Sequence, residues 1–410
     1  MRNSLDVTWP QEGLTRVPYA LYGRDDVYAE ERERIFRGPS WNFLCLEVEV
    51  PQPGDYRATF VGDIPVIVAR DLDGSLHAFE NRCAHRGALL CFKRGGHGRE
   101  ISCVYHNWTY DLRGNLTGVA FEHGINRQGG MPPDFKRQNH GLRKLLVESF
   151  AGLLFGTFSP DAPPLQEYLG PEIAARIRRV MCRPVVVLGS NSQMLPNNWK
   201  IYVENNRDSY HASLLHTFFT TFRMNRLSQE GGIIVDESGG HHVSYSKQAT
   251  DKASSEYDAT KLRANRDDYR LADPSLLDGR DEFGDGITLQ ILTVFPTFVL
   301  QQVQNSLAVR QVIPRGVDQT ELFWTHIGFA DDDASMRTIR QKQSNLVGPG
   351  GYISLEDGAV GGFIQRALPA SDGDSSIVAM GGADAVSQTT RATETAVRGF
   401  WKAYRGMMGF

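Results

Sequence analysis

The chain has 410 residues, of which 41% are hydrophobic and 22% are charged, and its formal net charge is −4. This length allows two or three domains with sizeable cores, and the weak negative charge excludes an electrostatic reason to bind nucleic acid or an anionic membrane. No apolar run is long enough to span a membrane, and the N-terminus has no apolar signal segment. Five cysteines in a chain of this size do not indicate a disulfide framework. We therefore expect a cytoplasmic protein whose thiolates are free to bind metal.

The predicted elements change in character along the chain. Short β-rich runs separated by turn formers predict an all-β region after about residue 54, and the run 152–159 is its expected last strand. Residues 160–164 are a Pro-containing linker; beyond it, 185–195 and 288–313 predict strands, whereas 197–219 and the tail 391–408 predict helices. The expected fold class is α+β, with a small all-β domain inserted into a larger domain that has an antiparallel sheet flanked by helices. The expected domains are 41–160 and 161–410, with an N-terminal segment 1–40 that packs with the larger one.

The first candidate site is a set of two Cys/His pairs, Cys83-x-His85 and, 17 residues later, Cys103-x-x-His106. A structural zinc site is one interpretation, because zinc binds two Cys and two His readily. Zinc fingers, however, pair Cys with Cys and His with His, whereas each short pair here contains one of each. A Rieske centre holds one iron of a 2Fe–2S cluster with two Cys and the other with two His. Two loops that each supply one Cys and one His meet this demand, so the stretch resembles a Rieske motif.

The second candidate site combines Asp208, His211 and His216 with a distant carboxylate, Asp357. Asp208 and His211 are expected on one face of a helix. His216 lies about 140° further round, so both His can reach one ion only if the helix ends, bends or widens between them. Asp357 lies in the Gly-rich stretch 347–365, where a turn or a helix cap is the alternative interpretation. Two His and one carboxylate form the facial triad of non-haem iron(II), which leaves coordination positions open for dioxygen chemistry.

The order and separation of these motifs resemble the large subunit of the Rieske-type aromatic-ring-hydroxylating dioxygenases over nearly the whole chain. By this resemblance the cluster ligands are Cys83, His85, Cys103 and His106, and the Fe(II) ligands are His211, His216 and Asp357. Glu356 is adjacent and acidic, but the family register places the ligand at the second residue of the pair. Val104 and Asn107 stand where Pro and Gly are common in the family; neither is a ligand, so this departure concerns the tuning of the cluster and not its presence.

The resemblance also implies cofactors and partners. Electrons from NAD(P)H pass through a separate reductase to the cluster and then to the iron, where O2 is the co-substrate; this chain has no Gly-x-Gly-x-x-Gly motif for a nicotinamide of its own. The implied assembly is an α3β3 hexamer with a small β subunit, in which the cluster of one subunit serves the iron of its neighbour. Asp208 matches the acidic residue that links a cluster His to an iron-ligand His across that interface.

The substrate is the least direct prediction. Within the family the chain is most similar to enzymes that act on aromatic acids, terephthalate first, with salicylate and anthranilate as alternatives. An aromatic acid needs cationic partners in an apolar pocket, and Arg offers a bidentate fork. Arg310, in a strand-like run, and Arg391, at the start of the helical tail, are the expected carboxylate partners, and Val347 and Ile353 are expected to line the ring face. The alternatives from other functional classes are a Rieske electron-transfer protein and a zinc-stabilised binding protein; the roughly 250 residues after the β domain disfavour the former.

Overall fold

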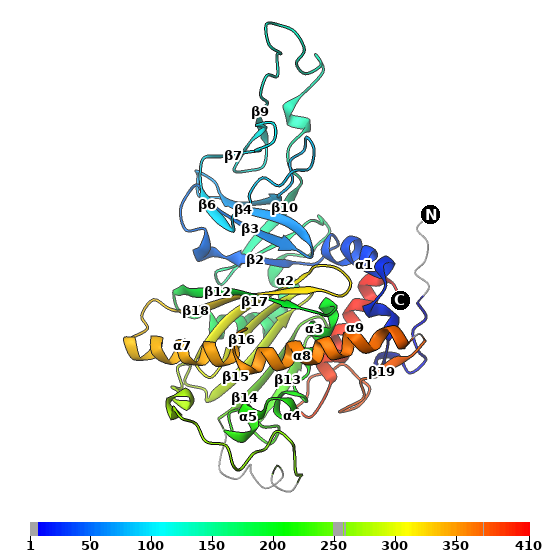
Figure 1. Ribbon diagram of the computed structural model, residues 1–410, viewed down its shortest axis with the longest axis vertical. Helices are drawn as coiled ribbons and strands as arrows, with labels where there is room; N and C mark the ends of the chain where they lie inside the picture. The colour runs from blue at the N-terminus through cyan, green and yellow to red at the C-terminus, as the bar shows by residue number, and fades with distance from the viewer. Residues whose placement is uncertain (1–6, 249–256, 258–259, 372) are drawn as a thin grey trace. The chain divides into compact units, whose positions relative to one another are not determined.

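The computed structural model describes residues 7–248, 257, 260–371 and 373–410. The chain forms two compact units, one comprising Met1–Ile35 and Gln166–Phe410 and the other Phe36–Leu165. We call them the catalytic unit and the Rieske unit after the motifs that each contains. The expected α+β fold class is confirmed, since the regular elements of the Rieske unit are almost all strands and the catalytic unit combines a sheet with helices (Figure 1). Within the ranges given above, no helix is both long and apolar enough to cross a membrane.

The Rieske unit contains two antiparallel sheets (Figure 1). The larger has the order β2-β11-β10-β5-β4-β3-β6, and the smaller has the order β7-β8-β9. In chain order the strands are β2 (Asn42–Leu46), β3 (Asp55–Val61), β4 (Ile64–Arg70), β5 (Leu76–Glu80), β6 (Gly95–His97), β7 (Glu100–Ser102), β8 (Thr109–Asp111), β9 (Leu116–Gly118), β10 (Lys144–Phe150) and β11 (Leu153–Thr157). One core cluster contains Phe79, Trp108 and Tyr110 together with Cys83 and Cys103. Both cysteines of the motif are therefore part of the packed interior.

The catalytic unit is organised around a seven-stranded antiparallel sheet with the order β12-β18-β17-β16-β15-β14-β13. Its strands are β12 (Val185–Leu195), β13 (Gly231–Val235), β14 (His242–Lys247), β15 (Ile287–Val294), β16 (Phe298–Val303), β17 (Ser306–Pro314) and β18 (Thr320–Phe329). The strands predicted at 185–195 and 288–313 are thus confirmed. A separate two-stranded sheet pairs β1 (Arg16–Pro18) with β19 (Ser375–Ile377).

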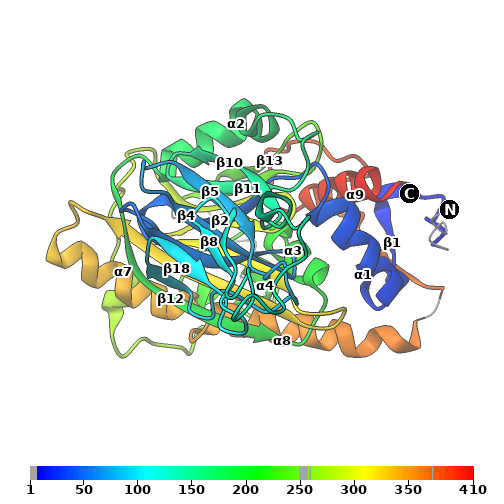
Figure 2. The ribbon, with the colours of Figure 1, turned by 90° about the horizontal axis from the view of Figure 1, so that it is seen from above.

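Helices cover both faces of this sheet. Helix α2 (Leu165–Val180) lies on one face, where the Arg176 carbonyl accepts a hydrogen bond from the Gln290 side chain. Helices α3 (Trp199–Arg207), α7 (Ala334–Val347) and α8 (Tyr352–Ala367) lie on the other face, and Figure 2 shows α2 on the opposite side from α7 and α8. Because side chains alternate along a strand, Leu289 and Ile291 point away from α2 and line a pocket beneath α3 and α8.

The segment 197–219 is not one continuous helix. Helix α3 ends at Arg207, α4 comprises Ala212–Leu215, and α5 comprises Thr217–Thr221. Asp208 is the extended residue that ends α3, so the expectation that it shares a helical face with His211 is wrong. His216 ends α4 with extended backbone (φ −78°, ψ 94°). The helix therefore ends between His211 and His216, which is one of the conditions under which both imidazoles can reach one ion.

The C-terminal helix α9 comprises Thr395–Met408. It begins four residues after Arg391, so the expectation that Arg391 opens this helix is wrong. Arg391 instead lies in the preceding loop, where its side chain is buried. Its position is therefore set by loop contacts and not by the helix.

Candidate active site

The two Cys/His loops of the Rieske unit share one backbone design. The amide of Gly87 donates to the Cys83 carbonyl, and the amide of Asn107 donates to the Cys103 carbonyl, both at 2.9 Å. Gly87 and Asn107 close these turns with positive φ angles of 73° and 54°. Asn is among the few non-Gly residues that adopt this conformation readily. Asn107 therefore preserves the turn at a position where Gly is common in the family.

The side chains of these loops separate into an inner pair and an outer pair. Cys83 and Cys103 are buried, and the Cys83 sulfur lies 3.3 Å from the Tyr110 hydroxyl. His85 is exposed, His106 is half-buried, and their ring centroids are 4.6 Å apart. The ring of His85 also stacks on Trp108 at 4.8 Å. An inner pair of thiols and an outer pair of imidazoles fit the donor set of a 2Fe–2S cluster with one iron on each side.

The same geometry disfavours a zinc site here. A tetrahedral zinc ion with bonds of about 2.0–2.3 Å would bring its four ligand atoms within about 4 Å of one another. Across the described part of the chain, the one group of three or more His, Cys or acidic residues whose ligand atoms lie within 4.8 Å of one another is His211, His216 and Asp357. The Cys/His pairs are therefore spread more widely than a single ion requires.

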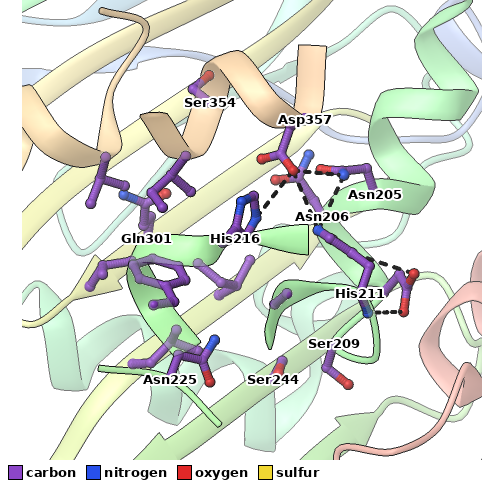
Figure 3. Close-up of a pocket in the computed structure, with 18 of the residues that line it drawn as sticks. Asn205, Asn206, Ser209, His211, His216, Asn225, Ser244, Gln301, Ser354 and Asp357 are labelled. Carbon is purple, nitrogen blue, oxygen red and sulfur yellow. Dashed lines mark hydrogen bonds and ion pairs between the residues drawn. The ribbon is translucent and has the colours of Figure 1, made fainter. Parts of the chain in front are cut away.

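His211, His216 and Asp357 converge in the catalytic unit from two parts of the chain (Figure 3). The Asp357 Oδ1 atom, from α8, lies 3.4 Å from His211 Nε2 and 3.3 Å from His216 Nε2. One oxygen and two imidazole nitrogens thus face a common point, which is the donor set of a non-haem iron facial triad.

In addition to Asp357, each of these imidazoles has a second carboxylate close to its Nδ1 atom. His211 Nδ1 lies 3.3 Å from Asp208 Oδ2, and His216 Nδ1 lies 2.7 Å from Glu356 Oε2. A carboxylate that accepts the Nδ1–H bond fixes the ring orientation and leaves Nε2 free as a ligand atom. Glu356 is therefore an orienting group for His216, which the sequence analysis did not predict.

Asn205 is a second residue that sequence reasoning missed. Its amide nitrogen donates to Asp357 Oδ1 at 3.0 Å and lies 3.3 Å from His211 Nε2 (Figure 3). It lies on α3, the helix that ends at Asp208, so one helix contacts two members of the triad. Its position three residues before Asp208 offered only a weak signal, because amides near helix ends are common.

The charges at this site are strongly coupled. Burial lowers the pKa of His211, but the Asp208 and Asp357 carboxylates outweigh this effect and raise the pKa to about 10. Burial likewise lowers and Asp357 raises the pKa of His216, with a net upward shift. Burial alone would raise the pKa of Asp357, yet His216 and His211 hold it well below its usual range. The carboxylate therefore attracts positive charge to this point, and a divalent cation would displace the protons from the imidazoles.

A pocket with an empty volume of about 610 Å³ adjoins the triad. Its apolar wall includes Leu289, Ile291, Val303, Val347 and Ile353, so both residues expected to line a ring face lie in it. Its polar wall includes Ser244, Gln301, Arg310, Trp324 and Arg391, of which Ser244 and Gln301 are labelled in Figure 3. The two arginines of the substrate hypothesis thus line the same pocket as the triad.

Both arginines have neutral partners. Arg310 donates from Nη1 to the Tyr202 hydroxyl at 2.7 Å, and its guanidinium lies 4.6 Å from the Trp324 ring centroid. Arg391 donates to the Asn225 side chain and to the Arg226 carbonyl, and burial lowers its pKa to about 10. The Nε atoms of both arginines are buried with no hydrogen-bond partner among the described residues. Two cations whose buried Nε donors are unused therefore line the pocket.

Comparisons with known proteins give a matching family for each unit. Residues 40–127 match the model of the Rieske [2Fe-2S] domain, and residues 175–409 match that of the ring-hydroxylating alpha subunit catalytic domain. The chain is 55% identical to the terephthalate 1,2-dioxygenase terminal oxygenase component subunit alpha 2 of a Comamonas species, over 98% of each chain. It is 43% identical to the anthranilate 1,2-dioxygenase large subunit of Burkholderia cepacia, over 99% of this chain and 96% of that one. Naphthalene 1,2-dioxygenase from a Rhodococcus species has the same fold, with a TM-score of 0.78, 22% identity and 97% of each chain covered.

The fold and the two sites define a Rieske oxygenase, and the chain belongs to the family of ring-hydroxylating dioxygenase alpha subunits. It is an enzyme with two cofactors, a Rieske 2Fe–2S cluster and a mononuclear iron. Like other members, it is a terminal oxygenase component that works with a separate reductase.

Proposed function

We propose that this oxygenase cis-dihydroxylates an aromatic dicarboxylic acid, terephthalate, using O2 and electrons that a separate reductase takes from NAD(P)H. The observation that carries the proposal is the pair of buried arginines, Arg310 and Arg391, that line the pocket beside the triad. Neither forms an ion pair with a carboxylate among the described residues, and each has an unused Nε donor. A buried cation without a counter-charge is costly, so the pocket favours a ligand that supplies two carboxylates.

The second candidate substrate class, a salicylate or an anthranilate, fits this charge pattern less well. Such an acid carries one carboxylate and would leave one of the two guanidiniums without an anion. Breaking a buried charge pair by removal of one partner costs about 3–5 kcal/mol. The 55% identity to a terephthalate dioxygenase subunit, against 43% to an anthranilate dioxygenase subunit, supports the same preference.

The ligands of both cofactors follow from the two donor sets. We assign His211, His216 and Asp357 to the mononuclear iron, which supplies the activation of O2, and Cys83, His85, Cys103 and His106 to the cluster, which supplies electrons. Asp208 and Glu356 then hold the Nδ1 protons of the two iron-binding imidazoles. Arg310 and Arg391 orient the ring through its carboxylates, while Val347 and Ile353 exclude water from the ring face.

We further propose a cytoplasmic α3β3 hexamer with a small β subunit. In this assembly Asp208 would accept hydrogen bonds from His211 and from a cluster-binding His of the neighbouring subunit. The Asp208 carboxylate is partly exposed, so one of its edges is open to such a partner. Gel filtration with light scattering, on this chain expressed with and without its β subunit, tests the stoichiometry.

The experiment for the proposed substrate is a panel of acids assayed with the partner reductase. Terephthalate, phthalate, benzoate, salicylate and anthranilate are compared for product formed per O2 consumed. Replacing either Arg310 or Arg391 by Ala should raise KM for terephthalate by about 30-fold or more, because a buried charge pair is worth about 2 kcal/mol or more when one partner is removed.

The matched control is Arg366→Ala, since Arg366 is an exposed arginine on α8 and does not line the pocket. Unchanged KM in both pocket variants would reject the carboxylate assignment. Colourless protein with one zinc per chain and no iron would reject the oxygenase itself.

A further inference from the structure

The Arg310 guanidinium is held on two sides by buried aromatic residues. Its Nη1 atom donates to the Tyr202 hydroxyl at 2.7 Å, and its plane lies over the Trp324 ring, 4.6 Å from the centroid. Tyr202 and Trp324 are each 1% exposed. Because both partners are packed into the interior, the guanidinium has little freedom to turn. Its Nε atom is buried without a hydrogen-bond partner among the described residues.

Tyr202 connects this arginine to the metal ligands through one helix. Tyr202 and Asn205 lie three residues apart on α3, so their side chains emerge on the same face. Asn205 donates to Asp357 Oδ1 at 3.0 Å and lies 3.3 Å from His211 Nε2. A short helix segment therefore contacts the arginine at one end and two triad residues at the other.

The start of α3 is itself fixed in the interior. The Asn198 side chain caps its first turn by accepting a hydrogen bond from the Lys200 amide. The Lys200 ammonium lies 2.6 Å from Glu31 Oε1, and both side chains are at most 1% exposed. Trp199 and Tyr404 donate to the same Glu31 carboxylate at 2.7 Å and 2.6 Å. The helix is thus a rigid spacer between the arginine and the triad.

We propose that Tyr202 is a positioning residue that sets the place of the Arg310 guanidinium relative to the triad, and so determines which ring edge of a bound aromatic carboxylate faces the metal. This inference rests on the proposed role of Arg310 as a carboxylate partner. Tyr202 acts through Arg310 and does not line the pocket that Arg310 lines. The phenol oxygen is a neutral acceptor, so it fixes the cation without competing with the substrate for its charge.

The test is the affinity of the iron-loaded oxygenase for terephthalate, measured by titration calorimetry without reductase, so that no turnover contributes. Tyr202→Phe removes only the acceptor oxygen. The Tyr202→Phe substitution should weaken terephthalate binding about tenfold or more, because a hydrogen bond to a charged group changes a binding constant by about that factor or a larger one. Tyr245→Phe is the matched control, because Tyr245 lies over Arg176 of α2, on the other face of the sheet.

A double-mutant cycle separates positioning from a general structural role. In the Arg310→Ala background, Tyr202→Phe should have almost no further effect, because the residue through which it acts is absent. The single variant should also lower the product formed per O2 consumed. Additive losses of affinity, or binding within twofold of the parent in Tyr202→Phe, would overturn the proposal.

The binding results for Arg310→Ala and Tyr202→Phe distinguish failure of this inference from failure of the proposed function. If Arg310→Ala binds terephthalate as tightly as the parent, the carboxylate assignment fails. If Arg310→Ala weakens binding but Tyr202→Phe does not, only the positioning role fails.

Trp324→Phe provides a second variant in case Tyr202→Phe does not fold. It reduces the aromatic surface beneath the same guanidinium and should also weaken binding.

Discussion

The two metal sites of this chain are built in different ways. In the Rieske unit, all four proposed ligands lie within residues 83–106, and two similar backbone turns place them. In the catalytic unit, His211 and Asp357 lie far apart in the sequence, and their meeting depends on how α8 packs beside α3. The first site is therefore set mainly by local turns, whereas the second is set by packing and by the carboxylates around it.

This difference extends to the partners of the imidazoles. His85 is exposed and stacks on Trp108. His211 and His216 instead each have one carboxylate close to Nδ1 and another close to Nε2. A local site tolerates change elsewhere in the fold as long as its two turns form. A site assembled by packing should respond to substitutions that never touch a ligand.

The largest expected effect separates the two sites completely. Asp357→Ala should abolish turnover while the visible spectrum of the cluster is retained, because it removes only a ligand of the mononuclear iron. Cys103→Ser should lose both the spectrum and turnover. Absorption spectra and iron counts per chain check both variants. Normal turnover in Asp357→Ala would make Glu356 or another carboxylate the ligand.

The next effect concerns the connection between the sites. Asp208→Asn keeps the shape of the side chain but removes its charge and one acceptor edge. Both metal sites should stay filled, yet reoxidation of the reduced cluster with substrate and O2 should slow by about 10–100-fold, the usual cost of losing such a supporting partner. Single-turnover stopped-flow absorption measures it, and oxidation at the parent rate would exclude the bridging role.

A substitution that changes only the packing of α8 should affect the second site and leave the first intact. A Cβ added at Gly361 of α8 would lie 2.1 Å from the buried Asn197 amide nitrogen, so α8 or Asn197 must shift. Overpacking of this kind costs about 1–3 kcal/mol. Gly361→Ala should therefore lower the occupancy of the mononuclear iron while the cluster spectrum is unchanged. Gly406→Ala, on α9, is the control, since its added Cβ meets nothing within 4 Å.

The sequence predicted what depends on residue type and short spacing. The two Cys/His pairs, the strands at 185–195 and 288–313 and the candidate triad could all be proposed from motifs. The contacts of Glu356 with His216, and of Asn205 with Asp357, could not, because they join residues whose proximity arises only from helix packing. The same holds for Asn225, whose contact with Arg391 connects two loops. The break at His216 was stated only as a condition, and the break after Arg207 was not predicted, since no Pro or Gly marks either one in the sequence.

The smallest expected effect is a pH dependence of stability that originates near the packed site. The Glu204 carboxylate of α3 accepts a hydrogen bond from the Tyr22 hydroxyl in a pocket that Asp208 also lines. Burial raises the pKa of Glu204 to about 8 from an ordinary value of 4.5, against the opposing effects of Tyr22, Trp401 and Lys200.

The folded protein therefore holds this proton over a pH range in which the unfolded chain has lost it. Stability from Glu204 is fully present below about pH 4.5, declines as the pH rises, and is lost above about pH 8. Glu204→Gln stays neutral in both states, so its melting temperature relative to the parent should rise between pH 5 and pH 9, by about 2 °C or more. Glu100→Gln, at an exposed position on β7, controls for the change in net charge. A difference between Glu204→Gln and the parent that is constant over this range would mean that Glu204 is already ionised in the folded protein.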